Sequence, residues 1–181
     1  AGVFNTTGSN NVAVGKNTMY ANTTGSNNVA VGALALDANT TGIKNTAVGQ
    51  AALGKNTTAN NNTAVGQGSL QENTTASNNT ALGMDALNQS TTGSQNVSVG
   101  ATSLQSNTTG ANNVAVGYAC LRTNTVGYNN IGMGTDCMQN LTTGFSNTAI
   151  GLGSMQDSTT ANKNAAFGQY ALHSTTTAAK N

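Results

Sequence analysis

The apolar positions of this chain recur with a 17-residue period from one end to the other. One unit is clearest at residues 107–123, which have the sequence NTTGANNVAVGYACLRT, and the same motif begins again at the same interval from Asn5 to Thr175 without an insertion. The positions of this unit are called column 1 (Asn107) to column 17 (Thr123) below. Such strict spacing is typical of a solenoid or fibre, in which one repeat makes one turn and each side chain stacks on its equivalents.

Columns 10 and 15 are apolar in every complete repeat, and they are the predicted core. Column 10 holds Val, Leu, Met, Ile or Phe, and column 15 holds Leu or Met. Column 8 is β-branched in every complete repeat except at Ala165, which suits a pleated strand. Because strand side chains alternate, columns 8 and 10 should share one face and column 9 should point to the other.

Column 9 is restricted to Ala, with Ser98 and Gly132 as exceptions, and this restriction predicts an interface between chains. A strand position that faces solvent would tolerate long polar side chains, so uniform smallness indicates that something packs closely over it. Each coil also supplies only about three sizeable core side chains to offset ~1 to 2 kcal/mol of backbone entropy per residue. We therefore expect a homo-oligomer, with a trimer favoured, whose interface contains Ala13, Ala30, Ala47, Ala64, Ala81, Ala115 and Ala149.

The invariant Gly of column 11 and Asn of column 7 indicate a tight coil. Gly fits a corner that needs positive φ or a close backbone contact, and stacked Asn side chains can form a hydrogen-bonded ladder. The Asn-Thr-Thr-Gly motif and the second Gly leave no window long enough for a stable helix. The apolar columns likewise argue against disorder. The predicted fold is all-β, a parallel β-solenoid (β-roll or β-helix) of 17-residue coils. Each coil has one strand, a Gly corner, a second short extended stretch that ends at column 15, and a return through columns 1–3.

The whole chain, residues 1–181, is predicted to be a single repeat array. Ten complete repeats occupy residues 5–174, and residues 1–4 and 175–181 are partial repeats, as expected for a piece of a longer fibre. Charged residues make up 6% of the chain and the formal net charge is +1, so there is no electrostatic footprint for nucleic acid or an anionic membrane. No apolar run is long enough to span a bilayer.

No residue pattern points to catalysis, a cofactor or a metal, so we do not expect an enzyme. The single His, His173, occupies a variable column that also holds Gln, Arg and Asp. Cys120 and Cys137 share column 14 one repeat apart, and we expect free thiols because in-register neighbours are farther apart than a disulfide allows. The acidic residues are spread over several columns and form no metal cluster or carboxylate pair: Asp37, Glu72, Asp85, Asp136 and Asp157.

The recurring Asn-Thr-Thr-Gly-x-Asn-Asn-x-Ala-Val-Gly-x-x-Ala-Leu resembles the repeats of phage tail-fibre and related bacterial fibre proteins. Its Val-Ala-Val-Gly core is also similar to the Ser-Val-Ala-Ile-Gly motif of trimeric autotransporter adhesin heads, whose repeat is shorter than the one in this chain. The resemblance implies a trimeric β-roll or β-helical shaft on a virion or cell surface, outside the cell. It also implies a stiff spacer that presents an adhesive surface to a cell-surface receptor or glycan.

Two other functions remain open. Thr is invariant in column 2 and nearly so in column 3, and in an extended segment columns 1 and 3 would share a face. Regular Thr arrays on flat β-solenoids are used by ice-binding proteins, so a surface ladder is predicted at Thr7, Thr24, Thr41, Thr58, Thr75, Thr92 and Thr109. The third candidate is a self-assembling extracellular filament whose uncapped ends join protomers.

Overall fold

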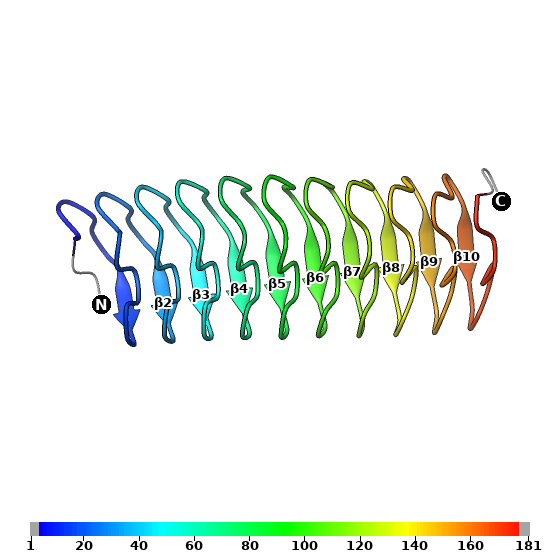
Figure 1. Cartoon of the computed structure of the whole chain (residues 1–181), viewed down its shortest axis with the longest axis horizontal. Coiled ribbons are helices and arrows are strands. Elements are labelled where there is room, and N and C mark those ends of the chain that lie inside the picture. Colours follow the sequence, from blue (N-terminus) through cyan, green and yellow to red (C-terminus); the bar gives the residue numbers. More distant parts are fainter. Residues whose placement is uncertain (1–3, 178–181) are drawn as a thin grey trace.

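The chain forms a β-solenoid in which each 17-residue repeat makes one turn. The computed structural model describes residues 4–177, and the outermost parts of the two predicted partial repeats, residues 1–3 and 178–181, lie outside the described residues. The coils follow one another along a nearly straight axis, with the two ends of the chain at opposite ends of the shaft (Figure 1). Within the described part all ten elements are strands, so the predicted all-β solenoid is confirmed.

One short strand per coil builds a single parallel sheet that runs the length of the shaft. Each strand covers columns 8–10, and neighbouring strands pair with a shift of one repeat, so that Val12 lies opposite Val29 and Ala13 opposite Ala30. In sequence order, which is also the order in the sheet, the strands are β1 Val12–Val14, β2 Val29–Val31, β3 Thr46–Val48, β4 Thr63–Val65, β5 Thr80–Leu82, β6 Val97–Val99, β7 Val114–Val116, β8 Ile131–Met133, β9 Thr148–Ile150 and β10 Ala165–Phe167.

The strands alternate as predicted, but the face that points inward is column 9. Val116 of column 10 is 37% exposed, whereas Ala115 of column 9 is fully buried. The assignment of column 10 to the core was therefore wrong. A coil this short is narrow, and its interior has room for only one small side chain from each strand.

The predicted interface through the column 9 alanines is also wrong, because these residues face the interior of their own chain. Except for Ala13 in the first described coil, which is only partly buried but still packs against the core, their exposed fraction is 0%: Ala30, Ala47, Ala64, Ala81, Ala115 and Ala149. They pack against column 14 of the same chain. Ser98 donates a hydrogen bond to the Ser103 carbonyl at 2.9 Å, and a methyl group on Gly132 would lie 2.7 Å from the Cys120 sulfur. Small side chains are required here by the width of the coil.

Column 15 is the core column that the sequence identified correctly. Leu53, Leu87 and Leu121 are completely buried. The stretch that leads to them is not extended as predicted, because columns 13 and 15 both have positive φ, for example 56° at Ala51 and 51° at Leu53. Left-handed backbone costs roughly 1 kcal/mol or more per residue away from Gly. Here it turns the chain within a few residues and directs the Leu side chain into the coil.

The Gly corner of column 11 is confirmed. Gly32 has φ 131°, and a Cβ built there would lie 2.6 Å from the Gly49 carbonyl oxygen of the next coil. Positive φ and this close backbone approach together exclude any larger residue.

Column 7 forms the predicted Asn ladder. The Asn45 backbone N–H donates to Asn28 Oδ1 at 2.9 Å, and Asn28 Nδ2 donates to the Gly42 carbonyl at 2.9 Å. The same exchange continues to Asn164, whose N–H donates to Asn147 Oδ1 at 3.1 Å. These amides are buried and hydrogen-bonded, so they stabilise the stacking of successive coils.

Column 1 carries a second buried ladder, and this one is interrupted. Asn39 Nδ2 donates to Asn22 Oδ1 at 2.8 Å, and the pattern continues to Asn73. The run of Asn is broken at Ser90 and Leu141, and later at Ser158 and Thr175. The oxygens that would meet an amide at Ser90 and Leu141, Oδ1 of Asn73 and of Asn124, are buried without a hydrogen-bond partner. These two breaks therefore each leave one orphaned acceptor.

Restoring the amide should stabilise the shaft. We expect Ser90→Asn to satisfy Asn73 Oδ1 and to offer an acceptor to Asn107 Nδ2, which raises the free energy of unfolding by about 1 to 2 kcal/mol. Urea unfolding measures this change. Ser94→Asn is the matched control, because Asn60 already fills the same column and accepts the Ile43 N–H at 2.7 Å. A midpoint for Ser90→Asn at or below that of the unaltered chain would contradict the ladder account.

Candidate functional site

The strand face presents exposed apolar side chains to solvent along the whole length of the described shaft. We use this name for the outward side chains of columns 8 and 10 on strands β1 to β10. Most members of column 10 are between 36% and 67% exposed, and they are Val14, Val31, Val65, Leu82, Val116, Met133, Ile150 and Phe167. Column 8 adds Val, Ile and Thr beside them. The result is a flat strip, two side chains wide, along the shaft.

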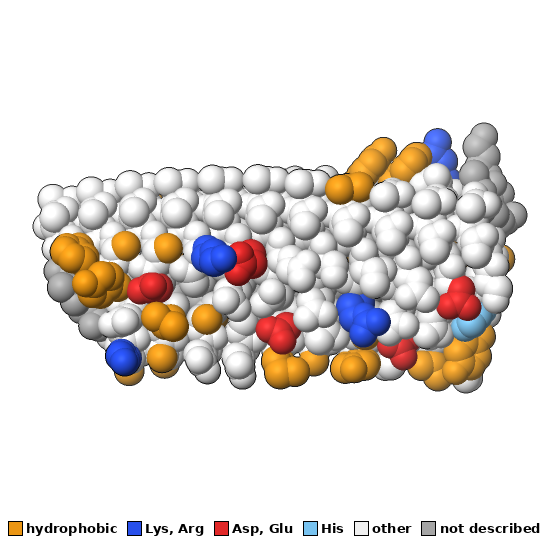
Figure 2. Space-filling model, in the orientation of Figure 1, with side chains coloured by type: hydrophobic (Ala, Val, Ile, Leu, Met, Phe, Trp, Pro, Cys, Tyr) orange, Lys and Arg blue, Asp and Glu red, His pale blue; other side chains and the backbone are white. Residues whose placement is uncertain are grey.

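Exposed hydrophobic residues also flank this strip at the Gly corner. Column 12 directly follows the corner, and it holds Met84, Tyr118 and Leu152, each at least 40% exposed. The face of the shaft shown in Figure 2 is different, because it is mostly polar with scattered charged and hydrophobic side chains. The apolar surface is therefore unevenly distributed around the coil.

The Thr columns have two different roles. The column 2 Thr residues are half-buried except near the two ends, and from Thr6 to Thr159 each hydroxyl donates to the carbonyl of the next coil, as Thr23 does to Thr40 at 3.0 Å. The predicted surface ladder is exposed at all seven positions, Thr7, Thr24, Thr41, Thr58, Thr75, Thr92 and Thr109. Within residues 4–177 none of these seven hydroxyls has a hydrogen-bond partner in the protein.

Columns 1 and 3 do not share a face, contrary to the expectation from an extended segment. Asn39 of column 1 is buried, whereas Thr41 of column 3 is exposed. The chain bends at columns 2 and 3, so the alternation of a strand does not apply there. The polar surface consists of one Thr file, and the Asn file belongs to the interior.

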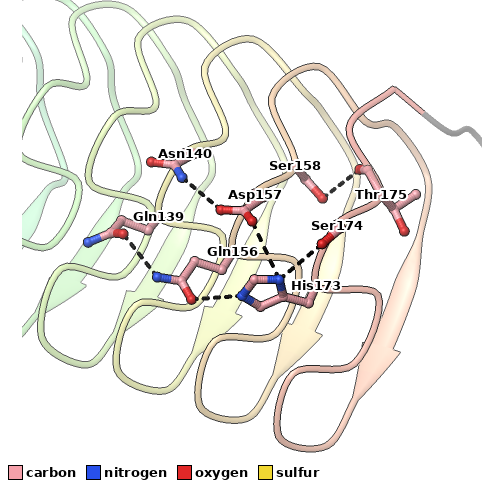
Figure 3. Close-up of polar contacts among 8 residues, drawn as sticks. All are labelled: Gln139, Asn140, Gln156, Asp157, Ser158, His173, Ser174 and Thr175. Carbon is pink, nitrogen blue, oxygen red and sulfur yellow. Dashed lines mark hydrogen bonds and ion pairs between the residues drawn. The ribbon is translucent and has the colours of Figure 1, made fainter.

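His173 belongs to a side-chain ladder at the C-terminal end of the shaft (Figure 3). Gln156 Nε2 donates to Gln139 Oε1 at 3.2 Å, and Gln156 Oε1 lies 3.1 Å from His173 Nε2. These three residues occupy column 16 in successive coils.

The second ring nitrogen of His173 does not complete a catalytic triad. Nδ1 lies 3.4 Å from Asp157 Oδ2 and 3.2 Å from Ser174 Oγ, so the carboxylate and the hydroxyl compete for one nitrogen (Figure 3). A triad needs the carboxylate on one nitrogen and the nucleophile on the other. Here the other nitrogen faces the Gln156 amide, so the cluster holds neighbouring coils together.

The remaining acids are surface features. Glu72 pairs with Lys55 of the preceding coil at 2.6 Å, and an exposed pair of this kind contributes about 0 to 1 kcal/mol. Partial burial raises the pKa of Asp37. In the part of the chain that the structure describes, no three His, Cys, Asp or Glu residues lie close enough together to hold a metal ion. The same residues include no helix that could cross a membrane.

The two cysteines are buried free thiols, as predicted. Cys137 Sγ donates to the Ala149 carbonyl at 3.2 Å. A hydrogen bond with Cys137, together with burial, raises the pKa of the Cys120 thiol well above its usual value. Because the folded thiol holds its proton more tightly than the unfolded chain does, Cys120 should reduce stability as the pH rises above about 8.5.

Thiol labelling tests this arrangement. We expect Ellman's reagent to react with the folded protein at least about 100-fold more slowly than with the protein in urea, because both sulfurs must first be exposed by opening of the coil. Raising the pH from about 7 to 9 should accelerate the reaction in urea much more than in the folded state. Equal rates in the two states would show that the thiols are accessible.

Comparison of the chain with protein-family models, with curated proteins and with solved structures finds no match. The class of the protein, a repeat β-solenoid, is therefore defined by its structure.

Of these surfaces, sequence reasoning found the Thr file and missed the strand face. A signal for the strand face was present in column 10, which ranges from Val48 to Phe167, whereas column 9 never exceeds Ser. A packed interior does not tolerate such a range of volumes, but an exposed face does.

Proposed function

We propose that this protein is the structural shaft of an extracellular or virion fibre. In this proposal the chain assembles as a homotrimer through its strand face, and it acts as a stiff spacer that can also present an adhesive surface. The observation that carries the proposal is the row of apolar column 10 side chains, which stays exposed or half-exposed along the single chain with Val, Ile and Thr of column 8 beside it.

The size of the strip supports a contact with other chains. Ten strands at ~4.8 Å spacing make it roughly 43 Å long, and two alternate side chains make it about 7 Å wide between their Cβ atoms. With side-chain width included, this area is about 400 Å², which is within the range of the largest apolar patch on a typical monomer, and such a patch is often functional. The hydrophobic residues of column 12 extend it at one edge.

The two unlike columns favour three chains around one axis. Column 8 carries smaller β-branched residues, whereas column 10 carries residues as large as Met133 and Phe167. Column 10 of one chain can pack against column 8 of the next. Such a contact joins two different surfaces, and repeating it by rotation about one axis gives a closed ring. Three narrow strips can meet in this way along their long edges, so that each strip is covered by its neighbours.

The same architecture supports the role of a spacer. Every coil is bonded to its neighbours by the parallel sheet and the column 7 ladder, and all described coils have the same length. A shaft of this kind grows by adding coils and keeps its cross-section.

A charge in the strand face should separate the chains. We expect Val116→Glu to reduce the solution mass of the protein from three chains to one, with an unchanged circular dichroism spectrum. The reason is that a carboxylate buried among apolar side chains weakens association by at least about 100-fold. Sedimentation at several concentrations gives the mass.

Two variants serve as controls. Thr109→Glu places the same charge in column 3 and should leave the mass unchanged, whereas Ala115→Glu places it inside the coil and should abolish the β spectrum. A wild-type chain that stays monomeric, or a Val116→Glu trimer, would contradict assembly through this face. Large open-ended polymers would favour the filament.

The exposed Thr file supports ice binding as a second candidate. Its hydroxyls recur at about 4.8 Å, free of protein partners within the described coils, on a shaft with regular turns. Such a file holds water at fixed intervals, which is what binding to a crystal surface requires.

Thermal hysteresis distinguishes this candidate from the shaft. An ice-binding protein should separate the freezing and melting points, and Thr58→Tyr should abolish the effect because a bulky ring interrupts the file. Thr57→Ser, in column 2, is the control, since it keeps the hydroxyl that donates to Thr74. No hysteresis in the wild-type chain excludes ice binding.

A further inference from the structure

Column 5 carries aromatic residues in two successive coils, and their rings stack. The ring centroids of Tyr128 and Phe145 are 5.0 Å apart and the ring planes are within 1° of parallel. In the other described coils column 5 holds Ser, Asn, Ile or Ala. Because this separation matches the ~4.8 Å spacing of neighbouring coils, the two rings lie one above the other along the shaft.

This stack is covered at one end and open at the other. On the C-terminal side, Lys163 Nζ lies 5.8 Å from the centre of the Phe145 ring. On the N-terminal side the next column 5 residue is Ala111, whose methyl group cannot cover a ring. Tyr128 is 44% exposed although Phe145 covers one of its faces. Its other face therefore borders a space about one coil wide above Ala111.

The surroundings of this space are partly apolar and partly polar. Val126 replaces the usual Thr of column 3 in the Tyr128 coil, and it is 46% exposed. Asn112 and Asn129 are exposed in column 6, and the Thr109 hydroxyl has no partner in the described chain. Figure 2 shows hydrophobic side chains gathered with a basic one at the upper edge of the C-terminal half of the shaft.

We infer that Tyr128 is the platform of a saccharide-binding site. A pyranose with equatorial hydroxyls has C–H groups on its faces and hydroxyls around its rim. Such a sugar ring can stack on the open face of Tyr128, above Ala111, and so extend the aromatic stack by one ring. Its hydroxyls can then form hydrogen bonds with the Asn112 and Asn129 amides and the Thr109 hydroxyl. Sites of this kind combine an aromatic surface with a few polar groups that fix orientation.

The charge of the protein disfavours the other flat ligand, a nucleobase. Proteins that stack bases also carry a positive groove for the phosphates, whereas this chain has a formal net charge of +1. The site is separate from columns 8 and 10 on the strand face, so the inference does not depend on trimer assembly.

Titration with defined sugars tests the site. The probes are the β-1,4-linked tetrasaccharides of glucose and of N-acetylglucosamine, together with lactose, observed by saturation-transfer NMR on the intact chain. We expect at least one to bind with a millimolar dissociation constant. Tyr128→Ser should weaken binding at least about tenfold, while Tyr128→Phe, which keeps the ring, should stay within about twofold.

Tyr20→Gln is the matched control. Tyr20 is similarly exposed but lies in column 16, where several coils carry Gln. The Tyr20→Gln substitution should therefore leave sugar binding unchanged. The inference is overturned if none of the three sugars binds, if Tyr20→Gln weakens binding as much as Tyr128→Ser, or if an oligothymidylate binds more tightly than the sugars. A changed solution mass for Tyr128→Ser would also overturn it, because the rings would then belong to a contact between chains.

Discussion

The fixed 17-residue register is the constraint on which the whole structure depends. The strands pair residues that lie one repeat apart, as Val12 pairs with Val29, and the column 7 amides join equivalent residues of neighbouring coils, as Asn45 joins Asn28. One inserted residue would put the coils on its two sides out of register, so the buried amides of columns 1 and 7 at that junction would lose their partners. The absence of any insertion between Asn5 and Thr175 is the sequence counterpart of that requirement.

The narrow coil explains which residues face inward and which face outward. Its interior accepts Ala from the strand, small residues from column 14 and one Leu or Met from column 15. The larger strand residues are excluded to the outside, where they form the apolar strip. The same restriction that lets a short repeat close on itself thus creates the surface through which we propose that chains associate.

Much of this fold was predictable from the sequence because column identity reports local geometry directly. The period, the Gly corner, the Asn ladder and the column 15 core followed from residue types that tolerate few conformations. Which face of the strand points inward did not follow from the sequence. Alternation places Val114 and Val116 on the face opposite to Ala115, but it does not say which of the two faces is interior. The left-handed residues at columns 13 and 15 were also missed, because Leu53 and Leu121 have no intrinsic preference for positive φ. Likewise, the sequence shows the stack only as two aromatic residues in column 5, Tyr128 and Phe145, and it does not show that their rings are in contact.

The interruptions at Ser90 and Leu141 give the shaft a feature that its regular outline hides. Each coil contacts only its neighbours, so cohesion along the axis is a series of separate junctions. Several of them lack the column 1 amide bond, and two of these contain an orphaned oxygen, at Asn73 and Asn124. Under axial load or thermal fluctuation, opening should begin at these junctions, and the coils between them should separate as blocks. The shaft is uniform in shape but segmented in mechanical strength.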